Sequence, residues 1–348
     1  MKLGILTFQF AHNYGALLQA YSLKKYLEEK LNSHVEIINY ANRRLKNAYS
    51  LVPVKSVKSI MKVPIKILQY NKFVKFLKDY IEIEGAFFQK IDFDKYDIVI
   101  VGSDQVWNTN ITFNDYTYFI NNDNSKLKKV SYAASIGTEG FEQSNVRDIV
   151  EMLSKFSLIS VRETSAQEYL KSDLGITSEL VVDPVFLHSK QFWSKLANKI
   201  NFIKPNQYIL YYALKGDSIL DMECKDLENS TGLPVYIIHP TCRKLARSGK
   251  LLINVGPREF LYAIMNARYV VTNSFHATAF SLIYEKDIRF TVIDKKSNRV
   301  ISMLESFGIE YDMLPNGCYM CENSLLDSKK YTKLLLKSQL FLDNILKN

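Results

Sequence analysis

Residues 269–284 read Tyr269-Val-Val-Thr-Asn-Ser-Phe-His-Ala-Thr-Ala-Phe-Ser-Leu-Ile-Tyr284, which is a short apolar run, a small polar turn and a helical apolar pattern. A strand that ends at Thr272-Asn-Ser274 and continues as a helix places this turn at the carboxyl edge of a sheet. In open α/β folds that edge binds ligands, and helix N-termini there offer unpaired N–H groups to anions. His276 falls in the first helical turn. The turn alone is compatible with a site residue or with a packed, satisfied histidine.

The first half of the chain repeats this alternation of buried strands and polar turns. The strands expected there are 2–7, 34–40, 97–102, 130–134, 158–161 and 180–182. Helical patterns lie between most of them, as in a doubly wound sheet. The polar turns that follow these strands should therefore lie together along one edge of a sheet.

A second series of strands begins near Gln207. The strands expected are 208–213, 235–239, 251–255, 269–272 and 288–293, with helices at 220–230, 257–267 and 277–284 between them. The pattern predicts an α/β fold of two Rossmann-like domains facing one another across a cleft. We expect an N-terminal domain over residues 1–188 and a C-terminal domain over 189–324, with a helix at 325–348 that packs back on the first. Neither half contains GxGxxG or a P-loop, which argues against a dinucleotide enzyme or an NTPase.

Composition describes an ordinary globular chain of 348 residues, 47% hydrophobic and 23% charged. The four cysteines include a lone CxxC, Cys318 to Cys321, without a second pair at zinc-finger spacing, so no metal site is predicted. The N-terminus runs directly into a strand pattern without a signal-peptide cleavage site. No apolar run reaches the roughly 18 residues of a membrane span. We therefore expect a cytoplasmic protein.

The net charge of +9 is unevenly distributed. Residues 41–78 contain ten Lys or Arg and no Asp or Glu. Within this segment Lys55, Lys58, Lys62 and Lys66 recur at helical spacing. A basic amphipathic helix is typical of peripheral contact with an anionic membrane, although a solvated helix face has the same pattern. No nucleic-acid partner is expected, because no nucleic-acid-binding motif accompanies the charge.

Several of these turns, taken together, resemble the polysaccharide pyruvyl transferases over nearly the whole chain. The matching stretches are Gly4–Phe8, Asn13–Gln19, Val101–Asn108, Tyr132–Gly137, Ser160–Glu163, Val182–Val185, Gly256–Leu261 and Thr272–His276. The resemblance implies a glycosyltransferase-B-like fold and phosphoenolpyruvate as co-substrate, with no other cofactor. It also implies that the acceptor is a sugar of a surface polysaccharide, carried on a lipid pyrophosphate at the inner face of the cell membrane. The product would be a pyruvate ketal that bridges two hydroxyls of one sugar.

Ketal formation requires an acid that protonates the enol carbon and a base that takes the proton of the attacking hydroxyl. We expect His276 to perform one of these transfers, because its unperturbed pKa lies near neutrality. Asp104 is a candidate for the base or for binding acceptor hydroxyls, and its alternative role is to cap the helix that follows.

The donor brings a carboxylate and a phosphate, so its site needs cations and N–H donors. We expect Arg162 to hold one of these groups, unless it only pairs with Glu163. The acceptor side is expected to use Asn13, Tyr14, Ser103 and Trp107. Trp107 could stack on a sugar ring, but an indole in this position also suits a core.

One departure from the family concerns the donor turn, Asn273-Ser274. Family members carry Ser-Arg-Leu-His where this chain has Asn273-Ser-Phe-His276, so their donor-gripping arginine is Ser274 here. Arg299 and Arg258 are the candidate replacements, and Lys295 and Lys296 are less favoured because consecutive lysines usually face solvent.

Two other functions remain compatible with these patterns. One is a glycosyltransferase that uses a nucleotide sugar in the same cleft, where the Gly256-Pro-Arg-Glu259 turn could meet the nucleotide. The other is a non-catalytic member of a polysaccharide assembly complex, which the presence of His276, Asp104 and Arg162 argues against.

Overall fold

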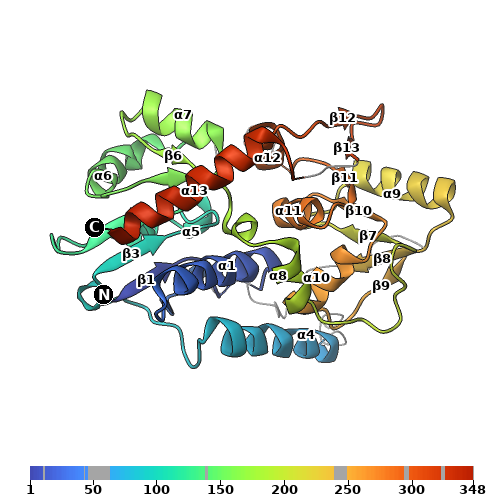
Figure 1. Ribbon diagram of the computed structural model, residues 1–348, viewed down its shortest axis with the longest axis horizontal. Helices are drawn as coiled ribbons and strands as arrows, with labels where there is room; N and C mark the ends of the chain where they lie inside the picture. Colours follow the sequence, from blue (N-terminus) through green and yellow to red (C-terminus); the bar gives the residue numbers. More distant parts are fainter. Residues whose placement is uncertain are drawn as a thin grey trace.

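The computed structural model describes residues 1–10, 12–42, 44–45, 63–137, 140–238, 249–293, 298–322 and 326–347. They form two α/β halves that lie side by side, each built around its own sheet (Figure 1). No helix of the described ranges combines the length and the apolar character needed to cross a membrane.

The first half contains a parallel four-stranded sheet with strand order β2-β1-β3-β4. Its strands are β1 (Leu3–Leu6), β2 (Glu36–Ile37), β3 (Ile98–Val101) and β4 (Lys128–Ser131). A parallel pair, β5 (Ser160–Val161) and β6 (Glu179–Leu180), continues this sheet through single bridges from Val130 to Leu158 and from Ala134 to Val161.

The second half contains a seven-stranded sheet with order β12-β13-β11-β10-β7-β8-β9. Five strands run parallel: β7 (Ile209–Tyr212), β8 (Val235–Ile238), β9 (Lys250–Leu251), β10 (Tyr269–Thr272) and β11 (Asp287–Phe290). The strands β12 (Asp312–Met313) and β13 (Tyr319–Cys321) are antiparallel additions at one edge. The central strands are buried along their length, which explains their continuous Val, Ile and Tyr runs.

Helices lie between most of the successive strands. Those of the first half are α1 (Tyr14–Leu31), α4 (Val63–Phe76), α5 (Thr109–Thr112), α6 (Gln143–Leu153) and α7 (Thr164–Ser172). The remaining helices are α8 (Lys190–Leu196), α9 (Ser218–Thr231), α10 (Pro257–Met265), α11 (Phe275–Ile283), α12 (Arg299–Phe307) and α13 (Lys329–Lys347). Short turns of tighter or wider helix occur at Leu77–Ile81, Phe93–Lys95, Tyr116–Phe119 and Pro184–Leu187.

The α/β fold expected from the sequence is confirmed. Each predicted strand overlaps an observed one: 269–272 is present as predicted, and the others are shorter, some of them beginning one or two residues earlier. The run 34–40 contributes only Glu36–Ile37 to the sheet, and the run 251–255 contributes only its first residue, next to Lys250. The apolar runs in the sequence extend beyond the last hydrogen-bonded residue of each strand, because the loops that follow are also buried. Ile38 and Val255 are examples. The basic residues Lys55, Lys58 and Lys62, and the side chain of Lys66, lie outside the described part of the chain.

Two helices tie the halves together. Helix α1 presents the Tyr14 ring to the second half, where it stacks on Phe260 with ring centroids 4.4 Å apart and its hydroxyl donates to the Val255 carbonyl oxygen at 3.0 Å. Helix α13 returns from the second half to the first (Figure 1), where the Ser338 hydroxyl oxygen accepts the Val182 N–H at 2.9 Å. The domain limits expected from the sequence stay predictions.

Candidate active site

A cavity of about 510 Å³ lies where the carboxyl edges of the two sheets face one another. Loops that follow β1, β3, β4, β7, β10 and β11 line it, so it occupies the position at which open α/β sheets bind ligands. The polar lining residues are Asn13, Asp104, Gln105, Lys215, Asn273, Ser274, His276, Thr291, Asn298 and Arg299. Both halves of the molecule therefore contribute to one site.

His276 lies in the first turn of α11 on the wall of this cavity. The Ser274 side chain caps the helix by accepting the Ala277 N–H at 3.4 Å, which fixes where the first turn points. The imidazole is buried, and its Nε2 lies 3.6 Å from Asp183 Oδ2. This distance suits an ion pair with a protonated ring but is too long for a hydrogen bond. Among the described residues, none forms a hydrogen bond with Nε2.

Asp183 stands behind the histidine at the end of the β6 loop. Its Oδ2 accepts from Arg162 Nη1 at 2.6 Å and from the Ser103 hydroxyl at 3.0 Å, and its Oδ1 accepts the Val185 N–H at 3.2 Å. Burial by itself raises the pKa of this carboxyl, but His276 and then Arg162 outweigh it and hold that pKa below its usual range. Asp183 is therefore a fixed anion next to the imidazole.

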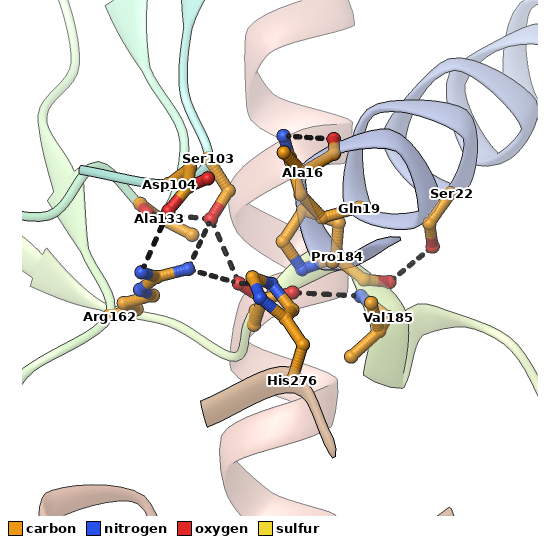
Figure 2. Close-up of polar contacts among 12 residues, drawn as sticks. Ala16, Gln19, Ser22, Ser103, Asp104, Ala133, Arg162, Pro184, Val185 and His276 are labelled. Carbon is orange, nitrogen blue, oxygen red and sulfur yellow. Dashed lines mark hydrogen bonds and ion pairs between the residues drawn. The ribbon is translucent and has the colours of Figure 1, made fainter. Parts of the chain in front are cut away.

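Arg162 joins three carboxylates in the buried layer beneath the cavity. Besides Asp183, its guanidinium donates to Glu163 Oε1 at 3.1 Å and lies 3.4 Å from Asp104 Oδ1. Figure 2 shows the guanidinium pointing toward Ser103 and Asp104, and His276 extending from α11 in the lower part of the view. Burial lowers the pKa of Arg162, but the three carboxylates more than reverse this and raise it. Donor binding by Arg162, predicted from the sequence, would require one of these pairs to open, because its side chain does not line the large cavity.

Asp104 does line the cavity, and its backbone has a positive φ of 76°. Its Oδ1 accepts the Gln105 N–H at 2.9 Å and faces Arg162. Its other oxygen, Oδ2, has no partner among the described residues, so this oxygen is available to a bound molecule.

The turn Asn273-Ser274 connects two neighbouring strands of the second sheet. The Asn273 side-chain oxygen accepts the Leu214 N–H at 2.8 Å, and its amide donates to the Lys215 carbonyl oxygen at 3.1 Å. This paired contact holds the loop after β7 beside the N-terminus of α11. It explains why an asparagine precedes the helix cap here.

Two cations of the described ranges line the cavity, Lys215 and Arg299. Arg299 begins α12, and its guanidinium lies 5.9 Å from the centre of the Phe275 ring. Of the two arginines considered as replacements at the donor site, Arg299 therefore lies at the cavity. Arg258 does not: it lines a separate cleft, where its Nε donates to the Leu196 carbonyl oxygen at 2.8 Å. Lys295 and Lys296 lie outside the described residues.

The acceptor residues expected from the sequence divide into two groups. Asn13 lines the cavity and caps α1 by accepting the Gly15 N–H at 3.0 Å. Ser103 is fully buried in the Arg162 and Asp183 layer. Tyr14 and Trp107 belong to the core: Tyr14 packs between the halves, and Trp107 is fully buried, donating to the Tyr118 carbonyl oxygen at 3.0 Å. Their rings are therefore not offered to a sugar.

In the described part of the chain, one group of side chains could hold a metal ion, and its residues do not line the cavity. Glu28, His34 and Glu82 bring three ligand atoms within 4.8 Å of one another, but the buried Lys24 ammonium already pairs with both glutamates. Cys318 is buried, and burial raises the pKa of its thiol to about 12, which disfavours the thiolate that metals bind.

Sequence reasoning missed three contributors to this site. Asp183 and Lys215 were given no role, and no contact between Gly15 and the histidine was predicted. Gly15 packs directly on the histidine: a Cβ built at this glycine would lie 2.1 Å from His276 Nδ1. Only the polar turn after each strand signals such residues, and it does not say which turns meet.

Comparisons with known proteins agree with this geometry. The family model for polysaccharide pyruvyl transferase matches residues 13–287, which is most of the chain. Among solved structures, UDP-GlcNAc 2-epimerase from Neisseria meningitidis bound to UDP-GlcNAc is similar, with 14% identity, a TM-score of 0.52 and 100% of each chain covered. The UDP-N-acetylglucosamine 2-epimerase from Rickettsia bellii is similar at 13% identity and a TM-score of 0.50, covering 99% of this chain and 95% of that one.

These likenesses establish a glycosyltransferase-B-like α/β fold and, at such low identity, only the fold. No curated protein matches the chain. The extent of the family match nevertheless decides the classification: the chain belongs to the polysaccharide pyruvyl transferase family.

Proposed function

We propose that the protein transfers pyruvate from phosphoenolpyruvate to two hydroxyls of a sugar in a lipid-linked surface-polysaccharide precursor, forming a pyruvate ketal. The observation that carries this proposal is His276, whose ring nitrogen lies 3.6 Å from the buried Asp183 carboxylate on the wall of a cavity shared by both halves. A histidine backed by a carboxylate is suited to donating a proton, because the carboxylate stabilises the imidazolium.

Charge at the cavity supports an anionic donor. Lys215 and Arg299 line it, and the capped N-termini of α1, α11 and α12 open on to it through Asn13, Ser274 and Asn298. Helix N-termini and cations together stabilise phosphate and carboxylate groups. We assign Arg299 and Lys215 to the donor's two anionic groups, with Asn273 and Ser274 shaping the turn between them.

The proposed reaction balances without a further reactant. His276 gives a proton to the methylene carbon of the donor, which creates oxocarbenium character at the neighbouring carbon. One sugar hydroxyl bonds to that carbon and gives its proton to Asp104. The second hydroxyl then bonds to the same carbon and gives its proton to the departing phosphate, while the bond between that carbon and the phosphate oxygen breaks and inorganic phosphate leaves. Exchange with solvent afterwards removes the proton from Asp104 and restores the one on His276. No cofactor or metal enters this scheme.

Arg162 has a positioning role in this proposal. Its guanidinium holds Asp183 at 2.6 Å and Asp104 at 3.4 Å, so it fixes the carboxylate behind the acid and the carboxylate that acts as base. A fully buried cation with three anionic neighbours is held more rigidly than a residue that must grip and release a substrate.

The test is an assay with phosphoenolpyruvate and a panel of galactosides, glucosides and mannosides that bear an aromatic aglycone. The proposal expects phosphate release together with a product whose mass has gained one ketal-linked pyruvate, and loss of both in His276→Ala. A thermal shift with uridine diphosphate but none with phosphoenolpyruvate, and no product from any sugar, would instead support a nucleotide-sugar transferase. Undiminished polysaccharide formation in cells by His276→Ala would support the non-catalytic role.

A further inference from the structure

The outer face of α4 carries an unusual concentration of exposed apolar side chains. Ile67, Leu68, Tyr70 and Val74 are 47%, 51%, 43% and 40% exposed. No other stretch of eight residues in the described ranges exposes four large apolar side chains. The opposite face of the helix packs on the rest of the protein, where Phe73 and Phe76 are buried in the core. Figure 1 places α4 at the outside of the molecule, below α1.

Basic side chains lie on the same face and along its border. Lys75 is exposed on the helix and Lys78 is exposed in the turn that follows it, and the whole segment 41–78 contains no carboxylate. Lys78 pairs with Glu84 at 3.0 Å, whereas no described carboxylate pairs with Lys75. An apolar row bordered by ammonium groups, of which Lys75 has no described carboxylate partner, is complementary to an anionic bilayer, in which acyl chains lie beneath phosphate groups.

A cleft of about 230 Å³ opens beside this face, between α4 and the N-terminus of α10. Lys72, Lys75 and Arg258 contribute its cations, and Phe76 and Tyr80 its aromatic walls. The Arg258 guanidinium lies 5.5 Å from the Tyr80 ring centre, and no described carboxylate pairs with it.

The carboxylate in this cleft, Glu259, is already compensated. Its Oε1 accepts from Lys72 Nζ and from the Asn198 amide, both at 2.7 Å, and its Oε2 accepts the Gly256 N–H at 3.0 Å. Burial raises the pKa of Glu259, but Lys72 and Asn198 outweigh it and lower that pKa. Lys75 and Arg258 therefore remain to bind an anionic headgroup.

We infer that the outer face of α4, with the adjoining Lys75 and Arg258 cleft, docks the protein on an anionic phospholipid surface. The apolar row enters the interface, and the cleft receives a headgroup phosphate. The apolar row and Arg258 do not belong to the charge pattern of 41–78, and the docking itself does not depend on the proposed reaction.

Docking through this face would bring the bilayer close to the active-site cavity, and this consequence does rest on the proposed function. The Gln69 amide donates to the Tyr14 hydroxyl at 2.8 Å, and Phe73 packs on the Tyr14 ring at 5.1 Å. The neighbouring Asn13 lines the cavity. An acceptor carried on a lipid could therefore reach the site along the N-terminus of α1.

The test is flotation of the full chain with phosphatidylcholine vesicles, with and without phosphatidylglycerol. The intact protein should bind only the anionic vesicles, and Lys75→Gln should weaken binding about fivefold, as expected for one basic group near an anionic surface. A combined Ile67→Ser, Leu68→Ser and Val74→Ser variant should lose most binding. Matched controls are Leu336→Ser with Leu340→Ser, exposed at 55% and 59% on α13, and Lys225→Gln on α9, which should bind like the unaltered chain.

Several outcomes would overturn the inference. They are no binding to anionic vesicles, equal loss in the control variants, or sedimentation showing that the α4 face joins two copies of the chain. A fourth outcome is vesicle binding that is abolished by inorganic phosphate but unchanged in the serine variants. That result would show that the cleft binds free phosphate and that the apolar row does not enter a membrane. Transfer to a water-soluble glycoside should persist in every docking variant. Vesicle binding by the intact chain without any transfer would therefore count against the proposed function alone.

Discussion

Gly15 and His276 touch across the two halves of the molecule. The Gly15 Cα faces the imidazole so closely that a Cβ would lie 2.1 Å from Nδ1 and 2.3 Å from Cγ. The first turn of α1 thus sets the position of a histidine that the second half supplies. A side chain at residue 15 must displace the ring.

Gly15→Ala should therefore reduce kcat by at least about tenfold, because moving a catalytic group by about 1 Å can lower the rate about a hundredfold. In an ordinary helix the same substitution would stabilise by about 1 kcal/mol. The matched control is Gly216→Ala, where a Cβ meets nothing within 4 Å. Steady-state kinetics with phosphoenolpyruvate would check this, and unchanged kcat in Gly15→Ala would show that the histidine position is not critical.

Asp183→Asn tests the anion behind the histidine. The change leaves the Arg162 guanidinium and the imidazole without their shared carboxylate, so unfolding in urea should show a loss of about 3–5 kcal/mol, and kcat should fall. Glu163→Gln is the comparison, because Glu163 pairs with Arg162 but forms no hydrogen bond or ion pair with His276 in the described part of the chain. It should lose stability while keeping more of the activity. Equal losses of activity in both variants would reduce Asp183 to a structural role.

The pH dependence of stability follows from the same carboxyl. The folded pKa of Asp183 lies below its unfolded value, so its contribution is fully present above the ordinary carboxyl pKa of about 4. It is lost as the pH falls through that value toward the folded pKa. We expect the free energy of unfolding, measured in urea between about pH 3 and pH 6, to fall more steeply with decreasing pH in the unaltered protein than in Asp183→Asn. The same pH dependence in both proteins would mean that Asp183 does not cause the loss of stability in acid.

Lys215 and Ser274 test how the donor is held without the family arginine. The strands β7 and β10 pair in register, and Tyr212 of β7 lies opposite Thr272 of β10 at the end of the pairing. The Asn273 amide donates to the Lys215 carbonyl oxygen, so Lys215 and Ser274 lie on adjacent loops. Lys215→Gln should raise KM for phosphoenolpyruvate about tenfold, the range of one charge-assisted hydrogen bond. Adding Ser274→Arg should restore part of the loss, although removing the helix cap costs about 1 kcal/mol.

Lys225→Gln, an exposed change on α9, provides the control for this series and should leave KM unaltered. Unchanged KM in Lys215→Gln would exclude Lys215 from donor binding and leave Arg299 as the described cation at the cavity.

The sequence predicted the α/β fold and several of the turns that meet at the cavity, because each strand and its polar turn are local features. His276, Asp104, Asn273, Ser274, Asn13 and Arg299 were identified in this way, and all of them line the cavity. Their chemical roles stay predictions.

Roles that depend on long-range packing could not be predicted. Trp107 and Tyr14 occur in polar turns, yet their partners are buried groups elsewhere, such as the Val255 carbonyl oxygen that Tyr14 reaches across 241 residues. Arg162 and Asp183 follow different strands, and only their pairing shows that the arginine faces a carboxylate instead of the cavity. Lys215 was missed because a single exposed lysine in a loop carries no pattern.

The central claim is that His276 protonates the methylene carbon of phosphoenolpyruvate during ketal formation. The direct measurement is transfer in deuterated water, with the product analysed by mass spectrometry and proton NMR. The account predicts a ketal whose methyl group contains one solvent deuteron, and no product from His276→Ala. A product that keeps a vinyl group, a methyl group without deuterium, or full activity in His276→Ala would contradict it.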